Sequence, residues 1–432
     1  MNKKRSAFSG KIGYVLSAAG ASVGLGNIWR FPYLAAKYGG GIFLLVYIIL
    51  ALTFGYTMIV AESALGRMTR KSPVGAFRSF AKGKKVGWLS FGGWINAIIP
   101  VLIVPYYSVI GGWVVKYLFE YIRGNGNKLA EDGYFSGFIS NGGATEICFV
   151  IFCLFTLVII YAGVQNGIER VSKIMMPILI VLSVIIAIYS VTRPGAIEGV
   201  KYFLVPNVKN FSWMTVVAAM GQMFYSLSIA MGILVTFGSY MRKDTSIEDS
   251  TRNVEIFDTA IAMMAGLMII PAVFAFSGGD PDTLQAGPSL MFITIPKVFA
   301  NMGFGTAVGI LFFVLVLFAA VTSSIALTES AVSTFEDELG WGRKKATILT
   351  GVIMIALGTL SCLGYGPLDF VKIIGMQFLD FFDFLTNSVM MPIAALMTSL
   401  LVSRVIGVDK IEEEIRHGES AFRRKKIFVV MI

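Results

Sequence analysis

Hydrophobic residues along this chain fall into long runs that short polar and charged segments separate. The hydrocarbon core of a bilayer is about 30 Å thick, and about 20 helical residues cross it. About ten of the runs reach that length, which predicts an all-α polytopic membrane protein. The predicted spans are residues 11–37, 41–66, 89–122, 145–163, 173–192, 212–240, 254–277, 305–335, 345–363 and 370–407.

Basic residues are concentrated in alternate loops. The loop after the second span, "GRMTRKSPVGAFRSFAKGKKVG", is rich in them, and smaller groups follow the sixth, eighth and tenth spans. Because basic loops remain on the cytosolic side, this pattern predicts a cytoplasmic N-terminus and a multi-pass protein of the plasma (inner) membrane. Residues 278–304 contain Pro and Gly at short intervals and are expected to cover the outside as short helices.

The composition supports the membrane interpretation. Only 14% of the residues are charged and 56% are hydrophobic, whereas a soluble domain has about 25% charged residues. The net charge of +10 comes from the basic loops and does not indicate nucleic-acid binding. Cys148, Cys153 and Cys362 lie in apolar runs without metal-ligand spacing and are expected to be buried thiols. The segment "MNKKRSAFSG" is typical of a retained cytosolic tail.

Two predicted spans contain segments that are unfavourable in a membrane helix. The first is interrupted at Ser22–Gly26 in "SAAGASVGLGNIWRFP", and the sixth at Tyr225–Gly232 in "YSLSIAMG". Unwound backbone is tolerated at membrane depth only where it is buried in protein or lines a cavity. Glycines alone fit a helix-packing interface equally well, but paired breaks in two halves indicate a transporter with inverted repeats and a site at the membrane midplane.

The expected architecture is therefore a 5+5 inverted-repeat core in which spans one and six are discontinuous. A short terminal run, "IFVVMI", is read as the start of an eleventh span. The predicted domains are a cytosolic gate segment, a first five-helix repeat, an extracellular loop, a second inverted repeat, and a cytosolic loop with the start of span eleven. They cover residues 1–10, 11–192, 193–211, 212–407 and 408–432 respectively.

Three motifs carry a family resemblance: "GLGNIWRFPYLAAKYGGGIFLLVY", "GQMFYSLSIAMG" and "AAVTSSIALTE". In these segments the chain resembles the neurotransmitter:sodium symporter family, and within it the bacterial amino-acid branch. The resemblance implies sodium-coupled import of a hydrophobic zwitterionic amino acid by alternating access. It implies two sodium ions as co-substrates and no organic cofactor, and it leaves the oligomeric state unknown.

The resemblance implies a first sodium ion held by Ser22, Asn27, Ser226 and Asp258. Asp258 stands where the family has Asn, and an ionisable residue inside a span is costly and functional by default. Animal members place a chloride ion beside this sodium, so the fixed carboxylate predicts transport that does not need chloride. The alternative is that Asp258 lies at the cytosolic end of its span and faces water.

A second sodium ion is implied at the carbonyl groups of span one and the hydroxyl groups of span eight. Residues three and four apart share a helix face, and hard oxygen ligands suit an alkali cation. The alternative for membrane Ser and Thr residues is helix packing. The implied ligands are Gly20, Val23, Ala319, Thr322 and Ser323.

For the substrate, the resemblance implies that the amides of Leu25 and Gly26 and the hydroxyl of Tyr107 hold the carboxylate. The amine would meet carbonyl groups near Ser22 and Ser226. Monoamine carriers have an acidic residue at the position of Gly24, so glycine favours a zwitterion, and Ala230 in place of a relative's Gly favours an aliphatic side chain. The side-chain pocket is expected to be formed by Ile103, Tyr225, Ser228, Met231, Ser324 and Leu327.

Charged pairs at the two ends are implied to be gates. Arg30 and Asp383 form the outer pair, with Gln222 supporting Arg30 and with Tyr107 and Tyr225 as a lid beneath. The inner pair is Arg5 and Asp337, with Tyr240 nearby, and Phe8 replaces a more usual Trp. Glu62 in span two is expected to brace the hinge of span six.

Other classes of protein fit the sequence less well than a symporter does. An enzyme is disfavoured because the only histidine, His417, lies in a charged cytosolic stretch and no metalloprotease or serine-hydrolase motif is present. A channel is disfavoured by the double gate. A transporter-like sensor that binds an amino acid without moving it stays open from the sequence alone.

Overall fold

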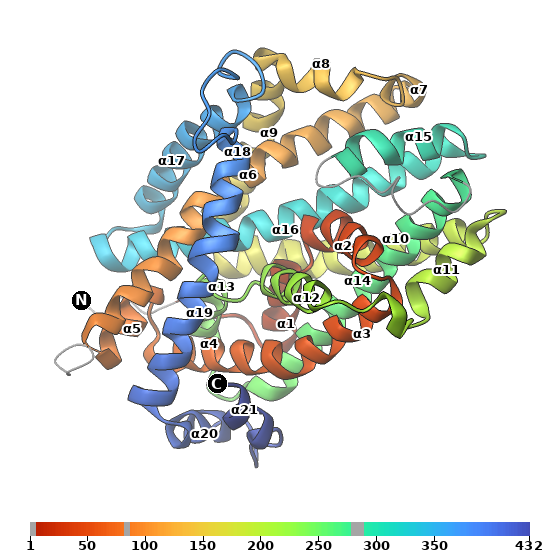
Figure 1. Cartoon of the computed structure of the whole chain (residues 1–432). Helices are drawn as coiled ribbons and strands as arrows, with labels where there is room; N and C mark the ends of the chain where they lie inside the picture. The colour runs from red at the N-terminus through yellow and green to blue at the C-terminus, as the bar shows by residue number, and fades with distance from the viewer. Residues whose placement is uncertain (1–5, 82–86, 278–288) are drawn as a thin grey trace.

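The computed structural model describes residues 6–81, 87–277 and 289–432, and these ranges are almost wholly helical (Figure 1). Within them, eight helical segments are long and apolar enough to cross a membrane. This identifies a multi-pass membrane protein. The eight are Gly41–Thr69, Gly87–Ile122, Gly142–Tyr161, Val164–Val191, Ile247–Ser277, Gly305–Leu339, Arg343–Leu363 and Phe378–Ile406.

Spans one and six are built from shorter pieces. Span one consists of α1 (Lys11–Ser22), a π-helical turn at Gly26–Arg30 and α2 (Phe31–Lys37). Span six consists of α12 (Trp213–Ser226) and α13 (Ile233–Tyr240). Both breaks fall where glycine and polar residues interrupt the apolar pattern, as the sequence predicts.

The remaining spans follow the hydrophobic runs with three main corrections. Span seven begins at Ile247 rather than at residue 254, since α14 (Ile247–Ser277) starts in the polar segment before the apolar run. Span five begins at Val164 rather than at residue 173, because a π-helical turn at Val164–Glu169 continues into α10 (Arg170–Val191). Span ten begins at Phe378 rather than at residue 370. The preceding "GYGPLDF" stretch forms turns, and Gly375 has a φ of +78° that favours glycine and ends regular structure.

The other helices complete the spans and cover their ends. Span two joins α3 and α4, span three is mainly α6, and span ten continues from α18 into α19. Short helices lie between spans and at the C-terminal end (Figure 1). Their bounds are α3 Gly41–Leu50, α4 Tyr56–Thr69, α5 Pro73–Ala81, α6 Phe91–Ile122, α7 Gly126–Leu129, α8 Tyr134–Ser140, α9 Gly142–Tyr161, α11 Ala196–Leu204, α14 Ile247–Ser277, α15 Ile295–Ala300, α16 Gly305–Leu339, α17 Arg343–Leu363, α18 Phe378–Asp383, α19 Met391–Leu401, α20 Val408–Arg416 and α21 Lys425–Met431.

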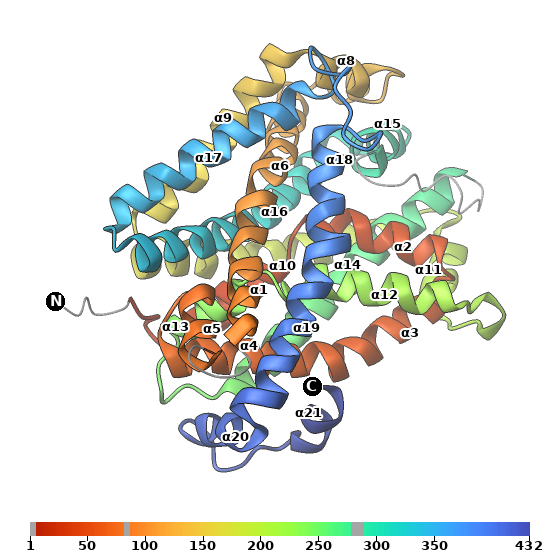
Figure 2. The ribbon, with the colours of Figure 1, turned by 60° about the vertical axis from the view of Figure 1, so that its left-hand side comes forward.

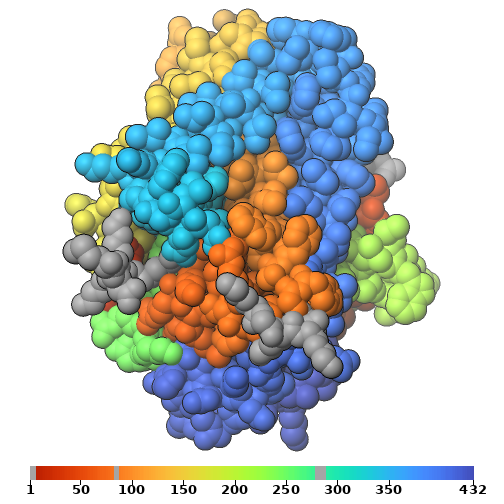
Figure 3. Space-filling view, turned by 90° about the vertical axis from the view of Figure 1, so that its left-hand side faces the viewer, coloured from red at the N-terminus to blue at the C-terminus, as the bar shows by residue number. Residues whose placement is uncertain are grey.

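The broken spans lie in the middle of the molecule. Helix α1 packs against α10, α14 and α16, and α13 packs against α4 and α16 (Figure 2). At the other end from α7 and α8, the C-terminal helix α20 packs against α4, and α21 packs against α4 and the π-helical turn at Ala51–Gly55 that precedes it (Figures 1 and 3). Unbroken helices therefore surround the unwound backbone, as backbone at membrane depth requires.

Candidate functional site

The break in span one exposes backbone groups to the centre of the protein. After α1 ends at Ser22, the amide of Gly24 donates to Asn27 Oδ1 at 3.1 Å. The amide of Leu25 donates to the hydroxyl of Tyr107 at 3.2 Å. The segment thus presents N–H groups at the start of the following half-helix, where a negative charge is stabilised.

The break in span six is strained. Ser228 and Ala230 have φ values of +55° and +61°, which are unfavourable for residues other than glycine. Such a conformation costs on the order of 1–3 kcal/mol and persists only where neighbours hold it. One such neighbour is Glu62, whose Oε1 accepts the amide of Ala230 at 2.8 Å. Glu62 therefore contacts the break in span six, where the sequence analysis expected it to support the hinge.

A buried carboxylate joins the two breaks. Asp258 on α14 is 0% exposed, and its Oδ1 accepts Asn27 Nδ2 at 2.8 Å and Ser226 Oγ at 2.7 Å. Its Oδ2 accepts the hydroxyl of Tyr47 at 2.5 Å. The alternative that Asp258 faces water is wrong. A buried carboxylate that meets only neutral donors lacks the charge compensation that burial normally requires.

The donor set at Asp258 fits an alkali cation. Carboxylate, hydroxyl and amide groups come from Asp258, Ser226 and Asn27, all buried, and hard oxygen ligands suit such ions. The Ser22 hydroxyl donates to Ala18 O at 3.1 Å, on its own helix. Tyr47 was missed in the sequence because a single Tyr in an apolar run has no distinguishing pattern.

Hydroxyl groups of α16 meet carbonyl groups of α1 close by. Ser323 Oγ lies 3.4 Å from Gly20 O and 3.3 Å from Val23 O. Thr322 Oγ1 lies 3.2 Å from Ala319 O, and its Cβ would lie 3.2 Å from a Cβ on Gly20. The structure therefore brings together all five residues of the second predicted sodium set.

A central cavity of about 20 Å³ lies between the breaks. It is small because the ring of Tyr225 covers Gly26, where a Cβ would lie 2.4 Å from the ring. Ser324 is not among the lining residues, since its hydroxyl lies 3.3 Å from that of Thr156. The lining comprises Ala21, Ser22, Gly24, Leu25, Gly26, Asn27, Ile103, Tyr107, Tyr225, Ser228, Met231, Ile233, Ser323 and Leu327.

A sequence model of the sodium:neurotransmitter symporter family matches residues 5–127 and 134–432. The chain belongs to this family. The family is one of transporters, so the enzyme alternative is wrong, and its sodium dependence makes sodium a co-substrate of this symporter.

Relatives and a solved structure agree with the family. The symporter is 36% identical to the uncharacterized sodium-dependent transporter YhdH of Bacillus subtilis, over 96% of this chain and 91% of the relative. The human sodium- and chloride-dependent GABA transporter 2 is 27% identical over 95% of this chain and 75% of its own. The crystal structure of MhsT in complex with L-phenylalanine has a TM-score of 0.89 and 36% identity, covering 99% of this chain and 96% of that one.

Outside the central cavity, the symporter has a second cavity of about 310 Å³ lined by Arg30, Tyr225 and Asp383, among others. The guanidinium of Arg30 lies 5.2 Å from the centre of the Tyr225 ring. Asp383 Oδ1 accepts Tyr106 at 3.1 Å and Asn387 at 2.6 Å. The two members of the predicted outer pair thus line one cavity, and no ion pair joins them among the described residues.

Gln222 does not support Arg30 as the sequence predicted. Its amide nitrogen donates to Gly26 O at 3.0 Å, and its Oε1 has no hydrogen-bond partner among the described residues. Gln222 therefore holds the half-helix that follows the first break. Sequence alone could not distinguish these roles, because Gly26 and Arg30 lie one turn apart.

The residues of the predicted inner gate lie only partly within the range that the structure describes. Arg5 lies outside the described residues, and Asp337 Oδ2 accepts the amide of Ser72 at 2.6 Å. The hydroxyl of Tyr240 donates to Glu329 at 2.7 Å, and Arg343 pairs with Glu329 at 2.6 Å. Sequence analysis missed Glu329, although an acidic residue inside an apolar span was a signal that could have found it.

Aromatic side chains enclose this inner end. The ring of Phe8 lies edge-on to those of Tyr14, Phe237 and Tyr240, at 5.6–6.1 Å between ring centres. Phe8 is 2% exposed, so it fills its site without the indole of the more usual Trp.

Proposed function

We propose that this symporter imports a hydrophobic zwitterionic amino acid together with sodium, by alternating access and without a need for chloride. The N-terminus is cytoplasmic and the protein lies in the plasma (inner) membrane, as the basic loops favour. The relative MhsT, crystallised with L-phenylalanine, supports an amino acid as the substrate.

The burial of the Asp258 carboxylate among neutral donors is the observation that supports this proposal most strongly. Its carboxylate is buried between Asn27 and Ser226 with neutral donors only. A sodium ion there supplies the missing positive charge, and the carboxylate supplies the negative charge that chloride supplies in animal relatives. Sodium is then bound by Ser22, Asn27, Ser226 and Asp258 at this first position.

The amino acid completes the coupling. Its carboxylate binds the amides of Leu25 and Gly26 and the hydroxyl of Tyr107, and also contacts the first sodium ion. Because each solute then improves the binding of the other, the two are coupled thermodynamically. The substrate's amine meets the carbonyl groups near Ser22 and Ser226.

The side chain of the substrate is apolar. Ile103, Met231 and Leu327 line the central cavity, and a Met can adapt its shape to different ligands. Gly24 excludes an acidic partner for a monoamine, since even a Cβ there would lie 2.5 Å from Ser323 Oγ.

The solutes bind and leave as the outer and inner ends of the protein open and close in turn. A second sodium ion at Gly20, Val23, Ala319, Thr322 and Ser323 ties α1 to α16 and favours an outward-open state. Tyr225, Arg30 and Asp383 close over the bound solutes, and loss of the second sodium inward frees α1. Asp337 and Tyr240 belong to the inner closure that then opens.

Uptake by purified protein in proteoliposomes tests the proposal. We expect sodium-driven uptake of one or more of leucine, methionine, tyrosine and tryptophan, unchanged when gluconate replaces chloride. Uptake that rises severalfold with chloride would overturn chloride independence. Binding without counterflow would instead support the sensor, and unitary currents without saturable uptake would support a channel.

A further inference from the structure

An apolar groove of about 380 Å³ lies between α9 and α17, outside the transport pathway. These two helices pack side by side (Figure 2). The groove runs from Thr347 to Ile355 along α17, which is about 12 Å at the rise of a helix. Its walls are Leu154, Leu157, Val158, Tyr161, Thr347, Ile348, Gly351, Val352 and Ile355.

One polar group in this groove has no partner. The hydroxyl of Thr347 is buried, and it makes no hydrogen bond within the described part of the chain. Thr347 as a whole is 4% exposed. The other helical Thr hydroxyls of α17 and α16 commonly bond back to a carbonyl, as Thr350 does to Ala346 O at 2.9 Å. The Thr347 hydroxyl has almost no accessible surface, so an oxygen of a ligand reaches it when the neighbouring side chains of the groove shift.

Two lysines lie at one end of the groove. Lys344 Nζ lies 5.7 Å from the centre of the Tyr161 ring, and both Lys344 and Lys345 are exposed. No ion pair to either lysine is found among the described residues, whereas their neighbour Arg343 pairs with Glu329. This end of the groove therefore has uncompensated positive charge next to an aromatic residue typical of the membrane interface.

We propose that the groove is a binding site for an anionic phospholipid. One acyl chain lies along the apolar wall, a glycerol ester oxygen accepts the Thr347 hydroxyl, and the phosphate lies against Lys344 and Lys345. Charge complementarity selects an anionic headgroup over a zwitterionic one. The assignment of the lipid to the cytosolic leaflet rests on the membrane orientation given under the proposed function. The binding site itself does not depend on that orientation.

The site adjoins the inner closure. Arg343, next to Lys344, also donates from Nε to Ile160 O at 2.8 Å and so joins α17 to the end of α9. A lipid wedged between the same helices would hold this junction and with it the Glu329 pair. Anionic lipid should therefore stabilise the state in which the inner end is closed.

Native mass spectrometry of the delipidated full chain tests the site. Dioleoyl phosphatidylglycerol and dioleoyl phosphatidylcholine are titrated separately, and we expect one phosphatidylglycerol to bind preferentially. The double variant Lys344→Gln/Lys345→Gln should weaken that binding by about 30-fold, since each basic residue near an anionic headgroup contributes about fivefold. Val352→Trp fills the groove and should abolish the preferential binding.

Matched variants separate the site from general effects. Lys410→Gln/Lys426→Gln removes two exposed charges elsewhere, and Val181→Trp adds a ring to the exposed face of α10; both should bind phosphatidylglycerol like the wild type. Equal binding of the two lipids by the wild type, which needs no variant to fold, would overturn the proposal. Equal losses of phosphatidylglycerol binding in the test and control variants would also overturn it. A dimer that Val352→Trp abolishes, without any preference between the two lipids, would show that the groove is an interface between two copies of the chain instead.

Discussion

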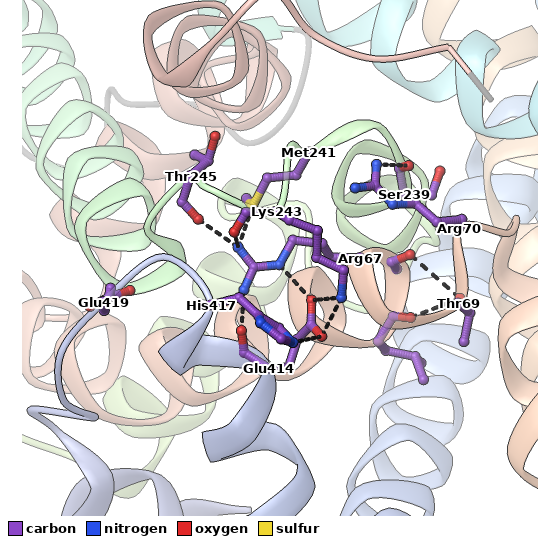
Figure 4. A network of polar contacts seen from close by, with 12 residues as sticks. Arg67, Thr69, Arg70, Ser239, Met241, Lys243, Thr245, Glu414, His417 and Glu419 are labelled. Atoms are coloured by element: carbon purple, nitrogen blue, oxygen red, sulfur yellow. Dashed lines mark hydrogen bonds and ion pairs between the residues drawn. The ribbon is translucent and has the colours of Figure 1, made fainter. Parts of the chain in front are cut away.

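Two buried carboxylates in this symporter have opposite surroundings. Glu414 on α20 is 5% exposed and lies 2.7 Å from both Arg67 Nε and Lys243 Nζ (Figure 4). Asp258 is 0% exposed and meets hydroxyl and amide donors, with no basic side chain bonded to it in the described part of the chain. The first is compensated by basic side chains of the protein, and the second is the position at which we propose that sodium binds.

The cluster around Glu414 has a structural role. Arg67, fully buried at the end of α4, also donates to the carbonyl of Thr245 at 2.5 Å and to the Glu414 carbonyl (Figure 4). It thereby joins α4, the loop after α13 and α20. His417 adds a ring nitrogen 3.9 Å from the Glu414 carboxylate. Burial of a carboxylate is thus no sign of a solute site. At Asp258 the informative feature is burial without a basic partner together with contacts to both broken spans, through Asn27 and Ser226.

The largest effect should come from removing the uncompensated charge. Asp258→Ala should abolish sodium-dependent amino-acid binding, and Asp258→Asn should weaken sodium by 100-fold or more, since a lost buried partner costs about 3–5 kcal/mol. Scintillation proximity binding of the transported amino acid over a sodium titration measures both. Wild-type sodium affinity in Asp258→Asn would show that the carboxylate is not a ligand.

The compensated cluster should respond in stability instead. Arg67→Gln leaves Glu414 with Lys243 alone and should cost about 3–5 kcal/mol, seen as a lower midpoint of thermal inactivation in detergent. Protein that remains folded should keep its sodium affinity. Arg67→Gln/Glu414→Gln should recover part of the loss, and an equal loss in the double variant would contradict the pairing.

A methyl group at Gly24 should reduce substrate affinity about tenfold or more. Its Cβ would lie 2.5 Å from Ser323 Oγ and 3.1 Å from the Tyr107 hydroxyl, so the groups proposed to hold the carboxylate must shift. Equilibrium binding of Gly24→Ala is compared with Gly221→Ala, where a Cβ meets nothing within 4 Å. Similar affinities for the two variants would exclude a close approach at Gly24.

Neighbouring serines on α16 offer a finer comparison. Ser323→Ala removes a hydroxyl that faces the carbonyl groups of α1 and should weaken sodium about 5- to 10-fold, as loss of about one interaction does. Ser324→Ala removes a hydroxyl directed to Thr156 and should leave sodium affinity unchanged. The sodium dependence of uptake measures the sodium affinity of both variants. Equal losses of sodium affinity in the two would contradict the second sodium position.

The smallest effect should be a weaker contact between α20 and α21 at low pH. Lys425 and Arg416 hold the pKa of the Glu412 carboxyl below its usual range. Because the pKa of Glu412 is lower in the folded than in the unfolded protein, its ionised carboxylate stabilises the fold at a pH above the unfolded-state pKa. That stability is lost as the pH falls through the folded-state pKa, so the α20–α21 contact should loosen below about pH 4. Hydrogen exchange of α20 measures this, and Glu412→Gln should remove the dependence.

The sequence predicted the spans and both breaks because polar and glycine residues are conspicuous in apolar runs. Asp258 could be selected for the same reason. The sequence analysis placed Ser324 in the substrate pocket, but its hydroxyl faces Thr156, because the direction of a side chain depends on how α16 is rotated by packing. Tyr47 and Gln222 find their partners across the fold, at Asp258 and Gly26, and no local pattern specifies such pairs.

Ala230 has an evolutionary consequence. Its left-handed backbone, with a φ of +61°, would be more comfortable for glycine. Ala230 is not among the residues that line the central cavity, so Ala230→Gly would relieve backbone strain without enlarging the pocket. In directed evolution, changes at position 230 should therefore alter the stability of the span-six hinge rather than the size of the substrate that is accepted.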